Sequence, residues 1–470
     1  MKTENKGGYT YSVRVTMRIP LVLPLLVMTA IAVSVRPATA EEEKEKKALN
    51  SILAHYDQGF RFQTGDGAFS LRINGGIQVR WTYVDYDPAI RYNQEDYSNF
   101  FVRRARLFFS GHAGSPRFAY LIQAQLEPSQ GLNASDLWLE YEFSDLLRLG
   151  AGRNKISYGL EMMNSGTALG LVERSLMYGE TDIDVGNASE PGPQYPGGGT
   201  NRFALSWYAD TGFATGGLTL YRSQGLQLRG LKGSESTPTF EYQLGVWQGR
   251  GTNSVSNSGN DHLLALRVGY YPWGFVDWKE VGDVEESPWF KLGIIGSAYA
   301  ERSEQPYVFN EDGYNIAVMG RWRGWSVDFE WGTESYDFEI FSDDFNREGW
   351  RTSLGWFVVP GKWEIRTRYA TIQRLKNPTY QNAMDSGLGI PEVWGGDEWV
   401  PALEARISEL SIGGSVRLPG WRNKLVFDLS RLVREFAADP GAVIDGAPQA
   451  IAKAPNQVDY RIRTMVQLVF

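Results

Sequence analysis

The sequence contains no cysteine and only three histidines, His55, His112 and His262, among its 470 residues. Without cysteine the chain has no disulfide framework, no thiol nucleophile and no thiolate ligand for a metal. No G-x-S-x-G motif, phosphate loop or nucleotide fingerprint occurs. An alternative, a membrane-embedded lipase, would need a nucleophile with a base in reach. His112 ends a predicted strand, where it is better explained as a rim residue, so we predict no enzyme, no cofactor and no metal site.

The sequence after residue 40 also lacks any apolar run of 18 residues, which excludes membrane-spanning helices. Residues 1–40 differ, with a basic start, an apolar stretch over 19–35 and the small-x-small sequence Ala38-Thr39-Ala40. This pattern predicts a secretory signal peptide over 1–40. A membrane anchor is the alternative, but the apolar stretch is short for one. Cleavage changes the formal net charge from −8 to −12, which argues against nucleic acid as a partner.

Alternation of apolar and polar residues is what the sequence does have. In the last strand, Tyr460, Ile462 and Val466 fall on one face, while Arg461 and Arg463 fall on the other. Strands of this kind, about 10 residues long with an apolar side toward lipid, are typical of outer-membrane barrels. In lipid a sheet must close on itself so that every backbone polar group is paired. The 13% aromatic content and the 52 glycines agree with such a barrel.

The number of strands comes from the same alternation. We count seventeen alternating runs between Phe69 and Phe470, whereas bacterial barrels have even numbers. Short connections fall on the periplasmic side when counted from either end, and the two counts disagree only between about 156 and 240. The stretch 217–230 is the expected source of the error. We therefore predict an all-β fold, an antiparallel transmembrane barrel of 16 strands, with 18 as the alternative.

The remaining segments complete the predicted organisation. Residues 41–66 are predicted to be a short helical or linker segment, with a charged helix over 41–58, and residues 67–470 form the barrel. The segment 156–201 is too long for a hairpin loop and can fold inward to narrow a pore.

Arginine is the polar residue that recurs on the inward faces. The parity of the strands directs these side chains into the lumen: Arg72, Arg80, Arg104, Arg106, Arg117, Arg202, Arg267, Arg321, Arg323, Arg351, Arg366, Arg368, Arg417, Arg461 and Arg463. Arg103, Arg222 and Arg431 are exceptions. Because a charged ring can select ions, the pattern favours an anion pore. Any charge avoids lipid, however, so the arginines could simply pair with the lumen acids Asp136, Glu140, Glu142, Glu241, Asp328, Glu330, Glu364 and Asp428.

Three motifs carry a resemblance to a known family. They are the arginine-rich strand 100–111 with its Arg103-Arg104-Ala105-Arg106, the run 136–141 that begins at Asp136, and the segment 152–161 followed by Glu173-Arg174-Ser175. Over about residues 60–180 the chain resembles the phosphate-selective porin O and P family. The resemblance implies a homotrimeric outer-membrane porin of 16 strands, with the long loop after the fifth strand helping to form an arginine- and lysine-lined constriction.

Carried onto this sequence, the resemblance gives Arg103, Arg104, Arg106 and Lys155 as matches to the family's basic positions and Asp136 as the strand-opening aspartate. The sequence departs from the family in having few lysines in its strands, which puts phosphate selectivity in question. Phe470 is the expected signal for the barrel-assembly machinery. We therefore expect passive diffusion of small anions, including phosphate or polyphosphate, with a general porin or a non-conducting structural or adhesive barrel as alternatives.

Overall fold

The computed structural model describes residues 52–85, 87, 96–126, 133–178, 218, 220, 222–248, 262–302, 309–338, 345–375, 392–394, 399–401, 403–420, 422–437, 443–444, 447–448 and 456–470. The chain divides into two units, residues 1–51 and 52–470, and the description concerns the second. The predicted signal peptide, Arg202 and the second half of the loop 156–201, apart from Leu218 and Leu220 just after it, lie outside the described residues.

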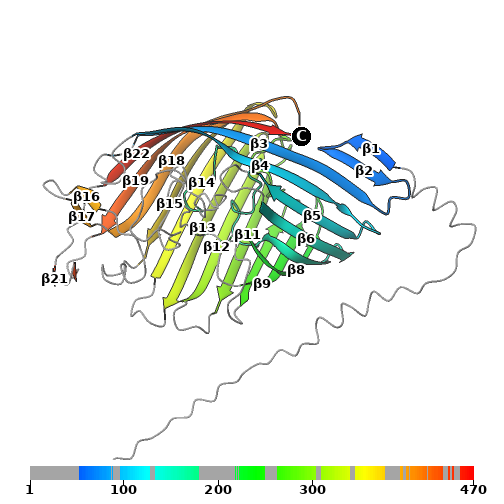
Figure 1. Cartoon of the computed structure of the whole chain (residues 1–470), viewed down its shortest axis with the longest axis horizontal. Helices are drawn as coiled ribbons and strands as arrows, with labels where there is room; N and C mark the ends of the chain where they lie inside the picture. Colours follow the sequence, from blue (N-terminus) through cyan, green and yellow to red (C-terminus); the bar gives the residue numbers. More distant parts are fainter. Residues whose placement is uncertain are drawn as a thin grey trace, which may run out of the picture. The chain divides into compact units, whose positions relative to one another are not determined.

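Sixteen antiparallel strands form a closed barrel (Figure 1). In chain order they are β3 (Ser70–Asp85), β4 (Tyr97–His112), β5 (Phe118–Gln125), β6 (Asn133–Ser144), β7 (Leu147–Lys155), β8 (Arg222–Lys232), β9 (Thr239–Gln248), β10 (His262–Tyr271), β11 (Lys291–Glu301), β12 (Phe309–Trp322), β13 (Trp325–Phe338), β14 (Phe345–Val359), β15 (Trp363–Arg374), β18 (Leu403–Arg417), β19 (Lys424–Ala437) and β22 (Gln457–Val469). Each pairs with the next, and β22 returns to β3. The predicted fold class and the count of 16 are confirmed, and the alternative of 18 is wrong for the barrel.

The barrel closes where the chain ends. Val469 lies opposite Gly76, and the backbone of Phe470 exchanges two hydrogen bonds of 3.0 Å with Gly75. We call this end of the barrel the C-terminal mouth and the other end the loop mouth. Most connections at the C-terminal mouth are short, such as the turn Arg323–Gly324 between β12 and β13. One is long, residues 272–290 between β10 and β11.

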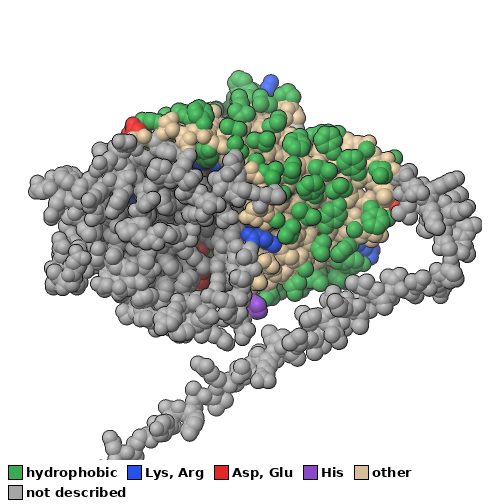
Figure 2. All heavy atoms as spheres, viewed as in Figure 1, with side chains coloured by type: hydrophobic (Ala, Val, Ile, Leu, Met, Phe, Trp, Pro, Cys, Tyr) green, Lys and Arg blue, Asp and Glu red, His purple; other side chains and the backbone are tan. Residues whose placement is uncertain are grey.

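The outer surface of the barrel is apolar. Along β22 the exposed side chains Tyr460, Ile462, Val466 and Leu468 alternate with buried ones, as the sequence pattern predicts. Figure 2 shows hydrophobic side chains spread over the visible outer face, with few charged ones among them. A surface of this composition is stable only against lipid. Among the described residues, no helix is long and apolar enough to cross a membrane.

The segment before the barrel differs from its prediction. The helix expected over 41–58 lies largely outside the described residues, but its last part is a strand, β1 (Ile52–Tyr56). It forms a hairpin with β2 (Phe60–Thr64), and β2 pairs with the start of β3. Ile52, Ala54 and Tyr56 alternate with Leu53 and His55, so the same apolar residues fit a two-residue period as well as a helical stripe. The helix prediction is wrong for residues 52–56.

The predicted strand boundaries are wrong near residue 222. The sequence pattern suggests strands over 202–210, which lies outside the described residues, and over 216–223, whereas the described strand β8 begins at Arg222 and ends at Lys232. Leu218 and Leu220 are fully buried but are not in a strand. Four short strands complete the list: β16 (Glu392–Trp394), β17 (Trp399–Pro401), β20 (Val443–Ile444) and β21 (Ala447–Pro448).

Candidate pore and constriction

The interior of the barrel contains a folded segment, residues 156–178, which we call the lumen loop. It leaves β7 at the loop mouth, and most of its side chains are buried. Ile156 and Tyr158 pack with Trp138 and Trp247 of the barrel wall, and Met162 packs in a cluster with Ala370 and Ile407. The predicted inward fold of the segment is therefore observed for its described half. The lumen loop fills much of the barrel with apolar contacts, so the open path is narrower than the barrel.

Glu173 of the lumen loop binds three arginines of the barrel wall. Its carboxylate accepts from Arg80 at 2.9 Å, from Arg103 at 2.5 Å and from Arg104 at 2.7 Å. All four side chains are almost completely buried. Burial alone would raise the pKa of Glu173, but the three guanidinium groups outweigh it and hold the pKa well below its ordinary range. We call these four residues the Glu173 cluster.

A β-bulge explains why Arg103 belongs to this cluster. Strict alternation directs Arg104 and Arg106 inward and Arg103 toward lipid. In the structure Gln78 lies opposite Arg104, while Val79 lies opposite Val102, so Arg103 is an extra residue in β4. A bulge of this kind re-aims a side chain. Arg103 therefore points inward beside Arg104, and the predicted outward orientation is wrong.

Two motifs from the sequence meet in the lumen loop. Glu161, from the segment 152–161, accepts hydrogen bonds from the backbone N–H of Ser175 at 3.0 Å and from the Ser175 hydroxyl at 2.5 Å. Arg174 donates to the carbonyl of Glu161 at 3.1 Å and to the carbonyl of Asn164 at 2.8 Å. The Nζ of Lys155 donates to the carbonyls of Met162 and Asn164, both at 2.9 Å. These motif residues hold the loop in one conformation.

Acids of the barrel wall bind the backbone of the lumen loop. Glu409 accepts from the N–H of Leu176 at 3.0 Å, and Asp428 accepts from the N–H of Val172 at 2.9 Å. Glu330 accepts from the N–H groups of Leu160 and Glu161. A buried loop without sheet or helix leaves its N–H groups unpaired unless side chains take them. The lumen acids provide that pairing.

The same acids also bind arginines of neighbouring strands. Arg351 lies 2.8 Å from Glu330, Arg368 lies 2.7 Å from Glu409, and Arg463 lies 2.8 Å from Asp428. Further buried ion pairs are Arg321 with Asp328, Arg366 with Glu364, Arg222 with Asp136 and Arg267 with Glu241. Arg461 lies 3.7 Å from Glu409. Much of the arginine pattern in the sequence is thus an ion-pair network that holds the wall and the loop together.

Besides Arg103, three positions depart from the predicted parity. Arg117 and Arg323 are exposed beside turns at the C-terminal mouth and do not face the lumen; Arg323 has a φ of 46° and stacks on Trp322. Arg222, predicted to face lipid, is buried in the lumen against Asp136. Arg222 is the first residue of β8, whereas the sequence pattern places it near the end of a strand over 216–223. Arg431 is exposed on the outer side, as predicted.

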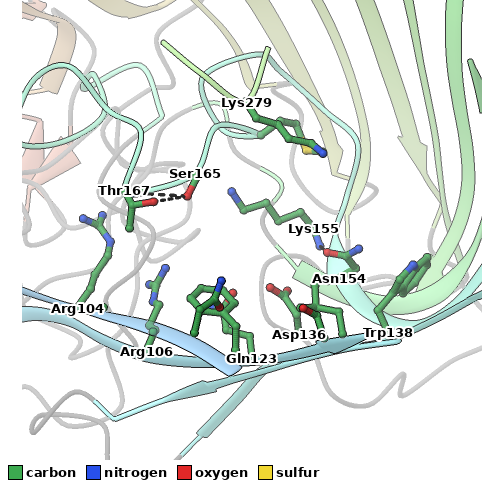
Figure 3. Close-up of a pocket in the computed structure, with 18 of the residues that line it drawn as sticks. Arg104, Arg106, Gln123, Asp136, Trp138, Asn154, Lys155, Ser165, Thr167 and Lys279 are labelled. Atoms are coloured by element: carbon green, nitrogen blue, oxygen red, sulfur yellow. Dashed lines mark hydrogen bonds between the residues drawn. The ribbon is translucent and has the colours of Figure 1, made fainter. Parts of the chain in front are cut away.

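A cavity of about 540 Å³ remains beside the lumen loop, against the wall formed by β3 to β9. Figure 3 shows Arg104, Arg106, Gln123 and Asp136 on this wall, with Ser165 and Thr167 of the lumen loop across the space and Lys155 and Lys279 directed toward it. The basic side chains that line the cavity are Arg72, Arg104, Arg106, Lys155, Arg222, Arg229, Lys279 and Arg422. The acidic ones are Asp136 and Glu140.

Both acids of the cavity are already bound to arginines. Asp136 lies 2.5 Å from Arg222, and Glu140 lies 2.6 Å from Arg229. Arg72 and Lys279 make no ion pair with any residue that the structure describes. The cavity therefore carries an excess of positive charge. Among the predicted residues, Arg72, Arg104, Arg106, Lys155, Asp136 and Glu140 meet here, whereas Arg80, Arg321, Arg366, Arg368, Arg461 and Arg463 lie outside its lining.

Sequence reasoning missed four residues that matter here. Glu173 was recognised only as part of a motif, and Arg229, Lys279 and Arg422 were not singled out. Arg229 shares the inward parity of Gln227, since the exposed Leu226 and Leu228 mark the outer face of β8. Lys279 and Arg422 lie in connections, where no alternation indicates a direction.

A closed barrel with an apolar outside and a charged, partly filled inside defines the class of this protein as a transmembrane β-barrel of the porin kind. The model of the phosphate-selective porin O and P family matches residues 73–261, from β3 to the connection before β10. The predicted resemblance to this family is confirmed over that range. The fold and the family match together support an outer-membrane porin.

A comparison with curated protein sequences found no match. Solved structures are similar at low identity. An anion-selective porin from Comamonas acidovorans has 9% identity over 85% of this chain and 100% of its own, with a TM-score of 0.48. OmpT of Vibrio cholerae has 9% identity over 89% and 100%, with a TM-score of 0.46. The outer membrane channel DcaP of Acinetobacter baumannii has 10% identity over 86% and 98%, with a TM-score of 0.45.

Proposed function

We propose that this protein is a passive outer-membrane pore that prefers small anions, and that solutes cross through the cavity beside the lumen loop. The observation that carries the proposal is the charge of that cavity, which has eight basic side chains in its lining and two acidic ones, both paired. Low-dielectric walls focus the potential of such a group onto the path of a solute. An anion that loses part of its hydration there gains contacts with guanidinium and ammonium groups.

The paired arginines play a different part in this proposal. A buried arginine bound to a carboxylate has its charge largely compensated at short range, and it is held in place. Arg80, Arg103 and Arg104 share the carboxylate of Glu173, and Arg80 and Arg103 do not line the cavity. We therefore assign the selection of anions mainly to cations that line the cavity outside the Glu173 cluster, among them Arg72, Arg106 and Lys155, and we assign to the cluster the positioning of the loop beside them.

Phosphate is one candidate solute, because a planar guanidinium matches its oxygens. The cavity has few lysines, and Lys155 already donates to two carbonyls of the lumen loop. A general preference for small anions is therefore the broader form of the proposal, and phosphate selectivity is its narrower form. A homotrimeric assembly, expected from the family resemblance, is part of the proposal as well.

The reversal potential of the purified protein in a planar bilayer under a chloride gradient tests the proposal. An anion-side reversal is expected, and the variant R106Q should move the reversal potential toward zero. The variant E142Q should not, because Glu142 is a mouth acid about one-third exposed and paired with Arg148. Block of conductance by added phosphate would support the narrower form. Reversal on the cation side, or the absence of any conductance, would contradict the proposal and favour a structural barrel in the second case.

A further inference from the structure

The connection between β10 and β11, residues 272–290, folds into the barrel from the C-terminal mouth, and we call it the inner connection. Val276, Trp278, Val281 and Asp283 are at most 7% exposed. A surface turn at a barrel mouth is normally short and solvated. This one behaves instead as part of the interior. The lumen is thus filled from both mouths, by the lumen loop from one and by the inner connection from the other.

The inner connection is attached to the wall along its length. The indole N–H of Trp278 donates to Glu241 at 3.1 Å, and Asp283 accepts from the N–H of Gly324 at 2.8 Å. Arg366 donates to the carbonyl of Val281 at 3.2 Å, and the N–H of Arg323 donates to the carbonyl of Ser287 at 2.9 Å. These contacts reach β9, β15 and the turn between β12 and β13. The segment is therefore fixed in place.

The inner connection also contacts the lumen loop directly. Leu160 and Met163 of the loop pack against Val276 and Trp278. The side-chain amide of Asn164 donates to the carbonyl of Trp278. Arg422 bridges the two segments, since it pairs with Glu280 and donates to the Thr167 hydroxyl at 3.2 Å. The two segments therefore pack against each other inside the barrel.

The inward fold of the inner connection places Lys279 in the lining of the cavity. Its side chain is exposed and lines the cavity, next to Trp278, whose ring lies 5.6 Å from the ammonium nitrogen. In Figure 3 Lys279 comes from the inner connection and faces the same space as Lys155. It lies on neither a strand nor the lumen loop. Its position depends entirely on the inward fold of residues 272–290.

We propose that the inner connection is a second constriction element, which confines solute to the β3–β9 side of the barrel and places Lys279 there as a specificity-determining cation. The confinement follows from the packing alone, whereas the role of Lys279 rests on the proposed anion preference. A cation held at a narrow point of a water-filled path raises the local concentration of anions.

Two sets of variants test the two parts in planar bilayers. Replacement of residues 276–286 by a short Gly-Ser turn should raise the single-channel conductance by about twofold or more, because it removes a packed segment from the lumen. K279Q should lower the anion-to-cation permeability ratio with little change in conductance. The control K232Q removes an exposed lysine near the same mouth, outside the cavity lining, and should leave the ratio unchanged.

Each outcome decides one part. An unchanged conductance in a folded turn-replacement barrel would overturn the confinement. If that variant does not fold, W278A is measured instead. It should show a higher conductance or more open-channel noise than the wild type. Conductance and noise equal to those of the wild type would contradict the confinement. A K279Q ratio equal to the wild-type ratio would overturn the role of Lys279. A wild-type protein that prefers cations would refute the proposed function instead, while the conductance of the turn replacement would still test the confinement.

Discussion

At the residue scale, the most consequential contact is one carboxylate bound by three arginines. Glu173 is the only acid among the described residues that lies within ion-pair distance of Arg80, Arg103 and Arg104 together. Removing one member of a buried charged group leaves its partners less well compensated, which costs far more than the net value of the group. The position of the lumen loop therefore depends on this side chain more than on any single apolar contact.

The variant E173Q is expected to lower the free energy of unfolding by about 3–5 kcal/mol, because three buried guanidinium groups would then face a neutral amide. It should also increase open-channel noise as the loop loosens. Urea unfolding in detergent and single-channel recording measure the two effects. E142Q is the control, since Glu142 and Arg148 are about one-third exposed and such pairs contribute at most about 1 kcal/mol. Equal effects of E173Q and E142Q would contradict the assigned role.

The stabilisation by Glu173 should persist in mildly acidic solution. Its pKa in the folded protein is well below the ordinary value of 4.5, so its contribution is fully present above the pKa of the unfolded chain. That contribution is lost only as the pH falls from the unfolded pKa toward the lower folded pKa. The difference in stability between the wild type and E173Q should be equal at about pH 7 and about pH 5.5, and smaller at about pH 3. If the difference in stability between the wild type and E173Q is already smaller at about pH 5.5 than at about pH 7, the lowered pKa of Glu173 is contradicted.

At the scale of elements, the lumen loop is held by its own geometry as well as by charges. Gly159 has a φ of 71°, in the left-handed region. A Cβ at this position would lie 2.2 Å from the hydroxyl oxygen of Tyr178. That hydroxyl donates to Glu330 and accepts from Asn315 at 3.0 Å. A side chain at residue 159 would therefore displace the contact that joins the two ends of the loop to the wall.

The variant G159A should destabilise the protein by about 2–4 kcal/mol, from backbone strain and from the displaced tyrosine. G114A is the matched control: Gly114 has a φ of 73°, but nothing lies within 4 Å of the position that a Cβ would take there. It should cost about 1 kcal/mol, from strain alone. Urea midpoints compare the two. If G159A and G114A lower the stability equally, the contact between residue 159 and Tyr178 does not contribute to stability.

Alternation along the strands could be predicted from the sequence, and its failures have local causes. Inward Arg104 and Arg106 follow from parity, whereas inward Arg103 depends on a bulge that only the pairing with Gln78 and Val79 reveals. The start of β8 at Arg222 was obscured because the residues before it are also apolar. The inner connection has no periodic signal at all. Local pattern thus predicts strands well and predicts side chains in turns and lumen segments poorly.

At the scale of the whole molecule, two surfaces of opposite character are separated by one layer of sheet. Ile365, Ile412 and Leu429 lie on neighbouring strands and are each more than half exposed on the outer face. The inner face of the same strands carries Arg366, Glu364 and Asp428, all buried in ion pairs. This separation explains why the sequence is rich in charge and yet stable in lipid.

The variant I412R should lower the stability in lipid vesicles by about 2–4 kcal/mol, the cost of an arginine near the bilayer midplane. L418R, at the C-terminal mouth, should cost at most about 1 kcal/mol, because its charge reaches the interface. Urea titrations in vesicles measure both. An equal loss for the two variants would show that the outer face of β18 does not lie at the depth that its composition implies.

The pairing of the last strand of the barrel, β22, with the first, β3, affects when the barrel can close. Phe470 is the last residue, and its backbone completes the pairing of Gly75, nearly four hundred positions earlier. Until β22 has been synthesised, β3 has no neighbour on that side. A chain in transit to the membrane therefore carries an open sheet edge through the whole of its synthesis, and such edges invite aggregation.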